Sequence, residues 1–543
     1  MNKDTLIGIL LIFLIFILSE QFIWKKSKPT QAPPKAQTVT QPADTVKAQT
    51  EPQTQVSTIP SLVEPDMKTA AINDNIILEN DSLKVVFSNR GGVIKAVYLK
   101  KFFQSDRSFT QLIPPGHYLA NTVLLSENTT TDLKNLPFDY ELTQVNGMPA
   151  VHFYFTPEPD RMIEKTYVLD HNYGVRLNLK IHSVYSLVGY SLEYGSGIND
   201  TEIYSKTRGQ DYRFYAQVDN ALIKRNLQKL LKGSETLPGK TDWAAIRSKY
   251  FVLACKNQEP ILINSVKADT ANGSPSFVLT AKRDNPSVDW DEHFILYLGP
   301  ADYRILKIWN GGLENVAERG AAWLRWLVDI FAWFLKFLYK LIPNYGVVII
   351  IFSLVIKVLL HPLTHKSMDA SLKMQKIQPQ VQALQQKYKN DPKRMQEEMA
   401  KLYKEAGASP LGGCLPLLLQ MPVFFALYTV LRYSLDMRQA HFFGWLKDLS
   451  EPDPYYILPI LMGVFMIVQS LMLNPKKQEV EKMDEKQQAM QQSQRLMAWI
   501  MPVIMFFIFK SMPAGLVLYW TVFNILSIIQ QYYLQRHFAE KEK

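Results

Sequence analysis

The chain has little cysteine and lacks the compact motifs that mark many enzymes. Its two cysteines, Cys255 and Cys414, are too few among 543 residues for a disulfide framework and argue against a thiolate metal site. No G-x-x-x-x-G-K-[ST] phosphate loop is present. The histidines between residues 70 and 310 also lack metal-ligand spacing such as H-x-x-x-H. We therefore expect no catalytic residue, no cofactor and no metal.

The positive charge is not concentrated in any one segment. The net charge of +10 is spread along the chain, whereas a nucleic-acid-binding protein usually gathers it on one face. The pattern favours attraction to membrane lipids over binding of a specific nucleic acid. Apolar residues are concentrated at residues 5–24 and from about 321 to 534. These runs predict an integral membrane protein with a large domain outside the bilayer.

The first apolar run, residues 6–18, is not followed by the small residues of a signal cleavage site, since Ser19, Glu20 and Gln21 come next. We expect residues 1–28 to form an uncleaved membrane anchor helix; the alternative is a removed signal peptide. Residues 29–69 are rich in Pro, Gln, Thr, Ala and Lys. This composition cannot bury a core and predicts a disordered linker.

Residues 70–312 carry short β-branched and apolar runs separated by turn signals. This pattern predicts a large all-β sandwich. The histidines of this region are most simply scattered strand and loop residues, although a sugar-handling site that pairs one of them with a carboxylate stays open. Strands are expected at 75–79, 83–88, 93–99, 151–156, 163–169, 174–182, 276–281 and 293–298.

Residues 313–343 contain a predicted amphipathic helix, 317–342. Its charges are spaced by 4, 7 and 4 positions, which confines them to a stripe of about 60° on a helix. The remaining surface is Trp, Leu, Phe, Val and Ile, so we expect the helix to lie in the membrane interface. The alternative is a tilted spanning helix with its charges facing protein. The charged residues are Arg325, Asp329, Lys336 and Lys340.

Residues 344–536 predict five further membrane spans, followed by a short tail, 537–543. Loop 363–411 carries nine Lys or Arg residues and loop 474–495 carries five. Loop 432–454 carries only three Lys or Arg residues, together with four Asp or Glu residues. The positive-inside rule places the two basic loops and both termini in the cytoplasm, with residues of about 25–343 outside. Lysines at 25, 26 and 28 locally argue against this orientation. The spans are expected at about 345–361, 413–431, 455–473, 496–511 and 514–534.

Loop 363–411 is expected to form a helical hairpin, because two helical periodicities are interrupted near residue 390. Asp391 is the expected N-cap of the second helix and Pro392 its first residue. The basic and methionine side chains suit either packing within the hairpin or docking of a ribosome, a targeting factor or a nascent chain. The docking candidates are Lys373, Lys376, Lys387, Lys393, Arg394, Met395 and Met399.

One charge, Lys357, falls within the apolar stretch of the second span, and Ser353 and His361 lie four residues to either side of it. The other core spans have no Asp or Glu in their interiors. A lysine at mid-membrane costs roughly 2.5–3.5 kcal/mol, so it should face a polar cavity. The alternative is that it snorkels to the cytoplasmic surface. Polar residues that could line a cavity are Gln420, Gln469, Tyr519 and Asn524.

Four motifs resemble signatures of the YidC/Oxa/Alb insertase family and follow the family's order. The resemblance covers essentially the whole chain and is to the Gram-negative form. It implies a polytopic α-helical membrane protein with six transmembrane helices, five of them an insertase core, and a periplasmic all-β supersandwich. The motifs are PLT at 362–364, SPLGGCLPLLLQMPVF at 409–424, DPYYILP at 453–459 and PAGLVLYW at 513–520.

The resemblance implies a bacterial inner-membrane insertase and chaperone that acts on nascent membrane proteins, alone or with the Sec translocon. It also implies a hydrophilic groove, open to cytoplasm and lipid, with a basic residue five positions before Pro-Leu-Thr. That residue is usually arginine, and Lys357 stands there instead, which disfavours bidentate carboxylate binding. Ser353 matches a small hydroxyl position, and Tyr519 and Trp520 match an aromatic pair that contacts substrate.

Two rival functions compete with that of an insertase. A small-solute transporter would show internal repeats and intramembrane carboxylates, and neither is evident in the sequence. A membrane-anchored sugar-modifying enzyme would use the β domain, and turnover of sugars by that domain would favour it.

Overall fold

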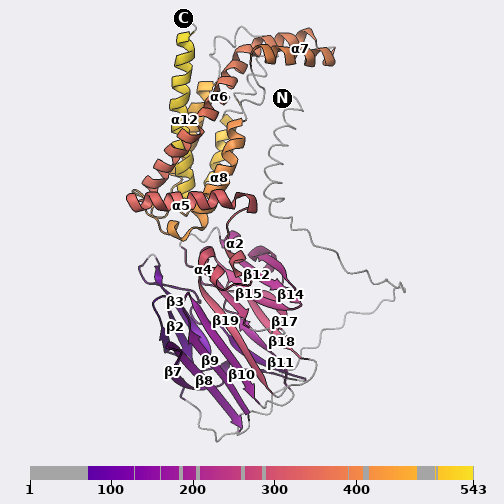
Figure 1. Ribbon diagram of the computed structural model, residues 1–543, viewed down its shortest axis with the longest axis vertical. Coiled ribbons are helices and arrows are strands. Elements are labelled where there is room, and N and C mark those ends of the chain that lie inside the picture. The colour runs from indigo at the N-terminus through magenta and orange to yellow at the C-terminus, as the bar shows by residue number, and fades with distance from the viewer. Residues whose placement is uncertain are drawn as a thin grey trace, which may run out of the picture.

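The structure is a computed structural model. It describes residues 71–541 apart from 105, 128, 159–160, 183–186, 203–207, 259–262, 284–288, 389–390, 408–414, 474–495 and 497–498. The predicted anchor helix and linker, 1–28 and 29–69, lie outside the described residues. Figure 1 shows a strand-rich part and a helical part stacked along the long axis of the molecule.

The described strands form three antiparallel sheets. The first has the order β1 (Ile76–Glu79), β2 (Leu83–Ser88), β3 (Val93–Phe103), β4 (Phe109–Gln111). The second has the order β13 (Ala221–Asn226), β12 (Arg213–Val218), β15 (Thr241–Arg247), β16 (Phe251–Asn257), β19 (Trp290–Pro300), β10 (Gly174–His182), β9 (Arg161–Leu169), β8 (Met148–Glu158), β7 (Asp139–Val145). The third has the order β14 (Glu235–Pro238), β17 (Ile263–Ala271), β18 (Ser274–Lys282), β11 (Leu187–Tyr194), β5 (Asn121–Ser126), β6 (Thr130–Asp132).

These sheets enclose one continuous apolar core, which makes them a single sandwich-like β domain. Strand β10 shows why the sequence predicts it: its buried residues alternate with exposed or half-buried ones along most of its length. The predicted bounds of β2 and β10 are confirmed. Strand β15 was missed because nearly all of its residues are buried, so it has no alternation to detect.

Short helices border the β domain and lead to the helical part. They are η1 (Leu133–Asn135), α2 (Arg208–Asp211), α3 (Leu227–Leu230), α4 (Tyr303–Ile308), η3 (Leu313–Val316) and η4 (Ala322–Leu324). The helical part contains α5 (Arg325–Leu341), α6 (Tyr345–Lys387), α7 (Pro392–Glu405), α8 (Leu415–Tyr433), η5 (Leu435–Met437), α9 (Ile457–Leu473), the helix Trp499–Phe509 and α12 (Ala514–Lys541).

Two described helices contain segments that are both long and apolar enough to cross a bilayer, Tyr345–Pro362 of α6 and Ala514–Arg536 of α12. Ile457–Met472 and Trp499–Phe509 are apolar but shorter. Helices α6, α8, α9 and α12 share a second apolar core with α5. The helical part therefore has its own interior, separate from that of the β domain.

Two predicted helix boundaries differ from the structure. The amphipathic helix was expected from residue 317, but α5 begins at Arg325. Gly320 has a positive φ of 70°, which interrupts any helix there. The expected break after residue 361 is also absent, because α6 continues through Pro362 and Pro379 to Lys387. The first arm of the predicted hairpin is thus an extension of α6.

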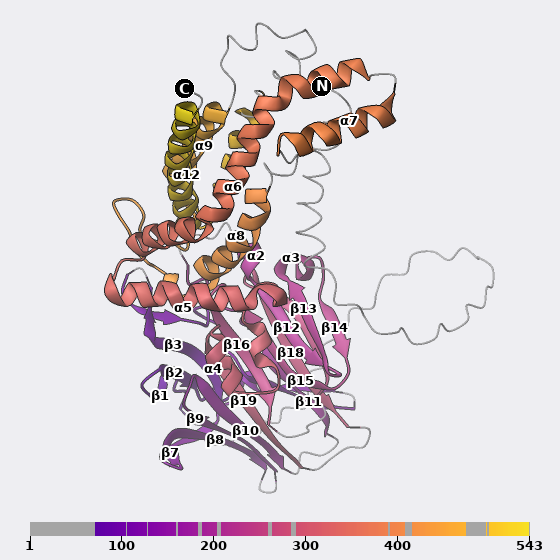
Figure 2. The same ribbon diagram turned by 45° about the horizontal axis from the view of Figure 1, so that its top comes forward.

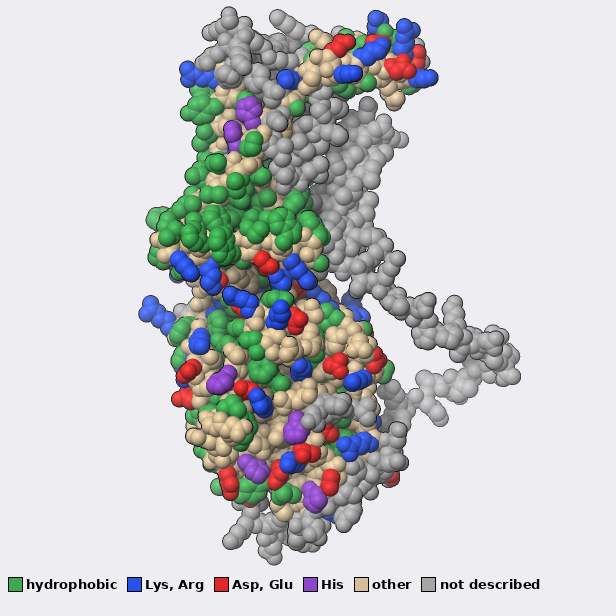
Figure 3. All heavy atoms as spheres, in the orientation of Figure 1, with side chains coloured by type: hydrophobic (Ala, Val, Ile, Leu, Met, Phe, Trp, Pro, Cys, Tyr) green, Lys and Arg blue, Asp and Glu red, His purple; other side chains and the backbone are tan. Residues whose placement is uncertain are grey.

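Helix α5 presents three different faces. Its charged stripe forms ion pairs outside the apolar core, Asp329 with Arg319 at 2.5 Å and Lys336 with Asp436 at 3.4 Å. A second face packs against the helical core through Val328, Phe331, Leu335 and Leu338. The third face is apolar and exposed, and it carries Trp326, Ile330, Trp333, Phe337 and Leu341. Figure 3 shows hydrophobic side chains gathered over the helical part at this level, with charges below them on the β domain.

In the described part of the chain, three buried ion pairs join the β domain to the helical part, and we call them the joint. Arg432 at the end of α8 contacts Asp211 at 3.0 Å, with both side chains buried. Lys249 contacts Glu451 at 2.7 Å, and Arg438 contacts Glu202 at 2.8 Å. Burial raises the pKa of Glu451 to about 7, although the nearby Lys249 acts in the opposite direction. The two parts therefore meet through specific charge pairs.

Candidate functional site

Lys357 lies on α6 and points toward α12. Its side chain is buried, with the residue only 8% exposed. The ammonium donates a hydrogen bond to the Ser527 hydroxyl at 2.8 Å and lies 4.4 Å from the centre of the Phe523 ring. No described Asp or Glu forms an ion pair with it. A hydroxyl and an aromatic face can stabilise a buried cation, but they leave its charge uncompensated.

Helix α6 presents further polar side chains on the face that carries Lys357. Ser353, Thr364 and Ser367 are all buried. The Ser353 hydroxyl donates to the carbonyl of Ile349 at 2.7 Å, and that of Thr364 donates to Leu360 at 3.0 Å. Such bonds to the preceding turn satisfy hydroxyls within a helix buried in an apolar environment.

Helix α12 carries a matching polar face. Thr521, Asn524, Ser527 and Gln531 follow one another at spacings of 3, 3 and 4 residues and are all buried. The amide nitrogen of Asn524 and both polar atoms of the Gln531 side chain have no hydrogen-bond partner among the described residues. Buried amides are normally satisfied, so this face is suited to hydrogen-bond with water or a bound polar segment.

Helix α8 adds Gln420, whose amide nitrogen donates to the Tyr519 hydroxyl on α12 at 2.6 Å. Both residues are buried, and the Tyr519 ring also lies 6.2 Å from that of Phe352 on α6. We define the polar cluster as Lys357 and seven of the buried polar residues on the facing sides of these helices. Its members are Ser353, Lys357, Thr364, Gln420, Tyr519, Asn524, Ser527 and Gln531.

Three of the predicted groove residues lie at the margin of this cluster. Trp520 is half-buried and packs edge-on against Phe424, with ring centres 5.4 Å apart. Gln469 is half-buried on α9 and forms no hydrogen bond with a cluster member in the described part of the chain. His361 is exposed, and its Nδ1 lies 3.0 Å from the side-chain amide of Gln530 on α12.

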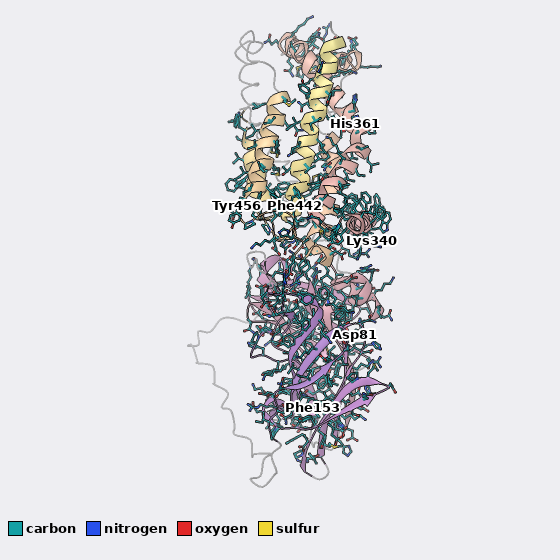
Figure 4. All side chains as sticks on the ribbon, turned by 90° about the vertical axis from the view of Figure 1, so that its left-hand side faces the viewer. Asp81, Phe153, Lys340, His361, Phe442 and Tyr456 are labelled. Carbon is teal, nitrogen blue, oxygen red and sulfur yellow. The ribbon has the colours of Figure 1, made fainter. Side chains whose placement is uncertain are left out.

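The position of His361 has a geometric explanation. It lies about 80° around α6 from Ser353, whereas Thr364 lies only about 20° away. Thr364 therefore occupies the buried position that the sequence analysis gave to His361. Figure 4 shows His361 well along the helices from Phe442 and Tyr456, which lie near the β domain. The polar cluster thus extends away from the β domain toward the hairpin.

The predicted hairpin residues lie at the opposite end of the helical part from the β domain (Figure 2). Asp391 caps α7 by accepting a hydrogen bond from the Arg394 backbone at 3.1 Å, and Pro392 begins the helix, as predicted. Lys387, Lys393 and Arg394 are exposed, while Lys373, Met395 and Met399 are half-buried. The side chain of Lys376 lies outside the described part.

The sequence analysis missed Thr364, Ser527 and Gln531. The spacing of polar residues in the last span could have revealed the latter two, because a 3-3-4 pattern places them on one helix face. The cluster combines neutral hydrogen-bonding groups with one cation. No group of described His, Cys, Asp or Glu side chains is arranged to hold a metal ion. The chemistry of the polar cluster is that of a polar binding surface within an apolar helical bundle.

Comparisons with known proteins cover nearly the whole chain. The family described as 60Kd inner membrane protein matches residues 337–542, and the one described as YidC periplasmic domain matches 75–334. A Syntrophus aciditrophicus protein named membrane protein insertase YidC is 32% identical, with 99% of this chain and 100% of that protein covered. Its namesake in Chlorobaculum tepidum is 31% identical, with coverages of 100% and 96%.

A solved structure titled as an active YidC insertase with its first transmembrane domain resolved is also similar. It is 20% identical and covers 86% of this chain and 94% of its own, with a TM-score of 0.36. The assignment of the chain to a family rests on the full-length sequence relatives and not on this structural similarity.

Proposed function

The chain belongs to the YidC family of membrane protein insertases, and on that premise we propose that the polar cluster holds the soluble tail of an incoming membrane protein during insertion. The protein is an insertase and not an enzyme, with a periplasmic β domain and a membrane region. The polar cluster supplies hydrogen-bonding partners that lipid cannot offer.

The observation that carries this proposal is the uncompensated charge of Lys357. Its ammonium contacts a hydroxyl and a ring but no described carboxylate. An acidic residue in a substrate tail would supply the missing partner. The unpartnered amides of Asn524 and Gln531 would bind the backbone of the same tail. This arrangement lowers the cost of moving a polar tail into the apolar layer.

Insertion then needs no nucleotide at this site. The tail enters the polar cluster, and the apolar segment that follows it moves along the lipid-facing helices. Burial of that segment in the bilayer provides the driving force. Closure of α6 against α12 through Lys357 and Ser527 would restore the resting arrangement after the substrate leaves.

We propose a topology of six transmembrane helices, the anchor 1–28 and five core spans, with both termini in the cytoplasm. The basic hairpin of α6 and α7 then faces the cytoplasm, as the positive-inside rule requires. Helix α5 lies at the periplasmic surface, because its exposed aromatic face and its charged stripe suit lipid and water respectively.

Further partners follow from this orientation. The exposed cations Lys387, Lys393 and Arg394 lie where a ribosome or targeting factor would approach. Met395 and Met399 add adaptable apolar contacts. We propose that the insertase works alone or with the Sec translocon, and that it also helps its substrates to fold. The family membership does not support the alternative of a sugar-modifying enzyme.

Substitutions of Lys357 test the proposed role directly. Lys357→Arg should keep insertion, Lys357→Ala should reduce it, and Lys357→Glu should reduce it most for substrates with acidic tails. A charge pair about 7 Å apart at an effective dielectric near 20 is worth roughly 2 kcal/mol, so the loss should reach about thirtyfold.

The measurement is insertion of single-span substrates whose tail charge runs from negative to positive, with each variant matched for protein level. Substrates with neutral tails are the internal control, since their charge interaction with residue 357 is absent in every variant. Equal insertion by the Glu and Arg variants across the series would exclude an electrostatic role.

A further inference from the structure

The hairpin that joins β3 and β4 ends in an exposed aromatic pair. Phe103 and Phe109 are cross-strand partners, and their ring centres lie 5.7 Å apart. They are 47% and 40% exposed. Between residues 71 and 322, they are the only aromatic residues among the large apolar side chains that the structure shows as exposed. The pair therefore presents apolar surface that nothing described in this chain covers.

This hairpin is held by the helical part of the molecule. The backbone carbonyl of Phe103 accepts hydrogen bonds from Arg438 at 2.7 Å and from the Gln439 side chain at 3.1 Å. Both belong to the segment between α8 and α9, in which Asp436 also pairs with Lys336 of α5. Figures 1 and 2 both show the hairpin rising from β3 to the underside of α5. The hairpin thus approaches α5 from the side of the β domain.

The hairpin carries two exposed cations and one exposed carboxylate near the aromatic pair. Lys101 and Arg107 are exposed, and neither forms an ion pair with a described carboxylate. The one nearby carboxylate at the tip, Asp106, accepts hydrogen bonds from Ser108. Aromatic rings flanked by free cations are typical of segments at the headgroup level of a bilayer.

We propose that the β3–β4 hairpin is a second membrane contact of the β domain. Phe103 and Phe109 enter the interfacial layer of the same bilayer that holds the helices, while Lys101 and Arg107 bind the phosphates of anionic lipids. The proposal rests on the placement of α5 at the periplasmic surface, since the hairpin rises toward the underside of that helix. It gives the β domain a lipid anchor of its own, separate from the joint.

The test uses the full chain reconstituted in vesicles of phosphatidylethanolamine and phosphatidylglycerol. A nitroxide label is attached at Phe109→Cys after Cys414→Ala; Cys255 is buried and unreactive at neutral pH, because burial raises the pKa of its thiol to about 12. Two further labels provide reference values. The label at Leu142→Cys, exposed on β7, is the reference for water, and the label at Trp333→Cys, exposed on α5, is the reference for lipid. Relative accessibility to oxygen and to a water-soluble nickel complex gives the depth of each label.

We expect the label at 109 to be more accessible to oxygen than to nickel, as at 333, and the label at 142 to show the reverse. Lys101→Glu with Arg107→Glu should shift the label at 109 toward water, as should vesicles of phosphatidylcholine alone. Water-like values at 109 beside lipid-like values at 333 would overturn the hairpin contact and leave α5 in place. Water-like values at both would overturn the placement of α5 itself. Protection at 109 that appears only with an added substrate would indicate a protein partner instead.

Discussion

The joint and the polar cluster both bury cations, and they do so in opposite ways. Each cation of the joint, Lys249, Arg432 and Arg438, meets a carboxylate within 3.0 Å. Lys357 meets a hydroxyl and an aromatic ring. A buried ion pair fixes how two surfaces meet, because losing or displacing one partner leaves the other charge buried without compensation. A buried cation without a carboxylate keeps its attraction for an anion that arrives later.

The comparison assigns a different task to each region. The joint holds the β domain in one position on the helices, and its charges are already satisfied. The polar cluster is held by weaker, neutral contacts, so a substrate can compete with them. Giving Lys357 a carboxylate partner should therefore weaken its attraction for a substrate. Removing a partner from the joint should lower the stability of the protein.

The largest effect is expected from giving Lys357 a carboxylate. Ser527→Asp places an anion where the hydroxyl now lies, 2.8 Å from the ammonium. Insertion of substrates with acidic tails should fall at least as far as in Lys357→Ala, because the cation is now paired within the protein. The thermal stability of the protein in detergent should stay the same or rise.

Ser527→Asn is the matched control for that experiment. It has nearly the same shape as the Asp variant but carries no charge, so insertion should be largely kept. Normal insertion of acidic tails by a stably expressed Ser527→Asp variant would contradict the distinction between the two regions.

The next effect concerns the pair between Arg432 and Asp211. Arg432→Met leaves the Asp211 carboxylate buried without its main partner, which should cost about 3–5 kcal/mol of stability. Arg432→Met with Asp211→Leu removes both charges and should recover most of that loss. Thermal unfolding of the full chain in detergent, analysed as a double-mutant cycle, measures the coupling.

An exposed pair provides the reference for the joint. Lys95 contacts Asp74 at 3.4 Å, but both side chains are largely exposed. Lys95→Met should change stability by less than about 1 kcal/mol. A comparable loss in Lys95→Met and Arg432→Met would show that burial does not strengthen the joint.

The joint should also respond to pH through Glu451. Burial raises the pKa of this carboxyl from 4.5 to about 7 in the folded protein. The folded state therefore binds more protons than the unfolded state between these values, so its stability is greatest below pH 4.5 and falls as pH rises through 7. Glu451→Gln should remove most of this fall, which is about 2 kcal/mol between pH 5.5 and 8.

Melting temperatures at pH 5.5 and 8 measure the effect. Burial also raises the pKa of Glu202, so a smaller slope of the same sign should remain in the variant. If Glu451→Gln leaves the difference between the two temperatures unchanged, Glu451 does not titrate in this range.

The smallest effect is expected at His361. Its side chain is exposed and contacts only the edge of the cluster through Gln530. His361→Ala should therefore change stability by less than about 0.5 kcal/mol and leave insertion unchanged. Thr364→Val, which removes a buried hydroxyl from the same helix, should have the greater effect on insertion of the single-span series. The opposite order would place the functional face of α6 at His361.

Local features were predictable from the sequence because they depend on neighbouring residues. The alternation that defines β10 and the cap at Asp391 are of this kind. The continuation of α6 through Pro362 was not predictable from local propensity, because α6 packs against α5 and α12 and Thr364 bonds the preceding turn. Packing there outweighs the loss of one backbone hydrogen bond.

The site was predictable only in part for a different reason. Lys357 was identifiable as a lone charge in an apolar run, but its contact with Ser527 joins residues 170 positions apart. That contact depends on how α6 and α12 pack, which no local pattern encodes. The joint was not foreseen at all, since its three pairs connect residues that the sequence analysis placed in separate domains.

The joint also sets an order of events during synthesis of the protein. Asp211 precedes Arg432 by 221 residues, which at 5–20 residues per second is a delay of about 10–45 s. During that interval the β domain folds with its half of the joint open to water. Charged side chains are well hydrated while they wait, whereas an apolar surface of the same size would attract other unfinished chains. We therefore expect the charges that later form the joint to keep this surface of the nascent insertase hydrated until their partners have been made.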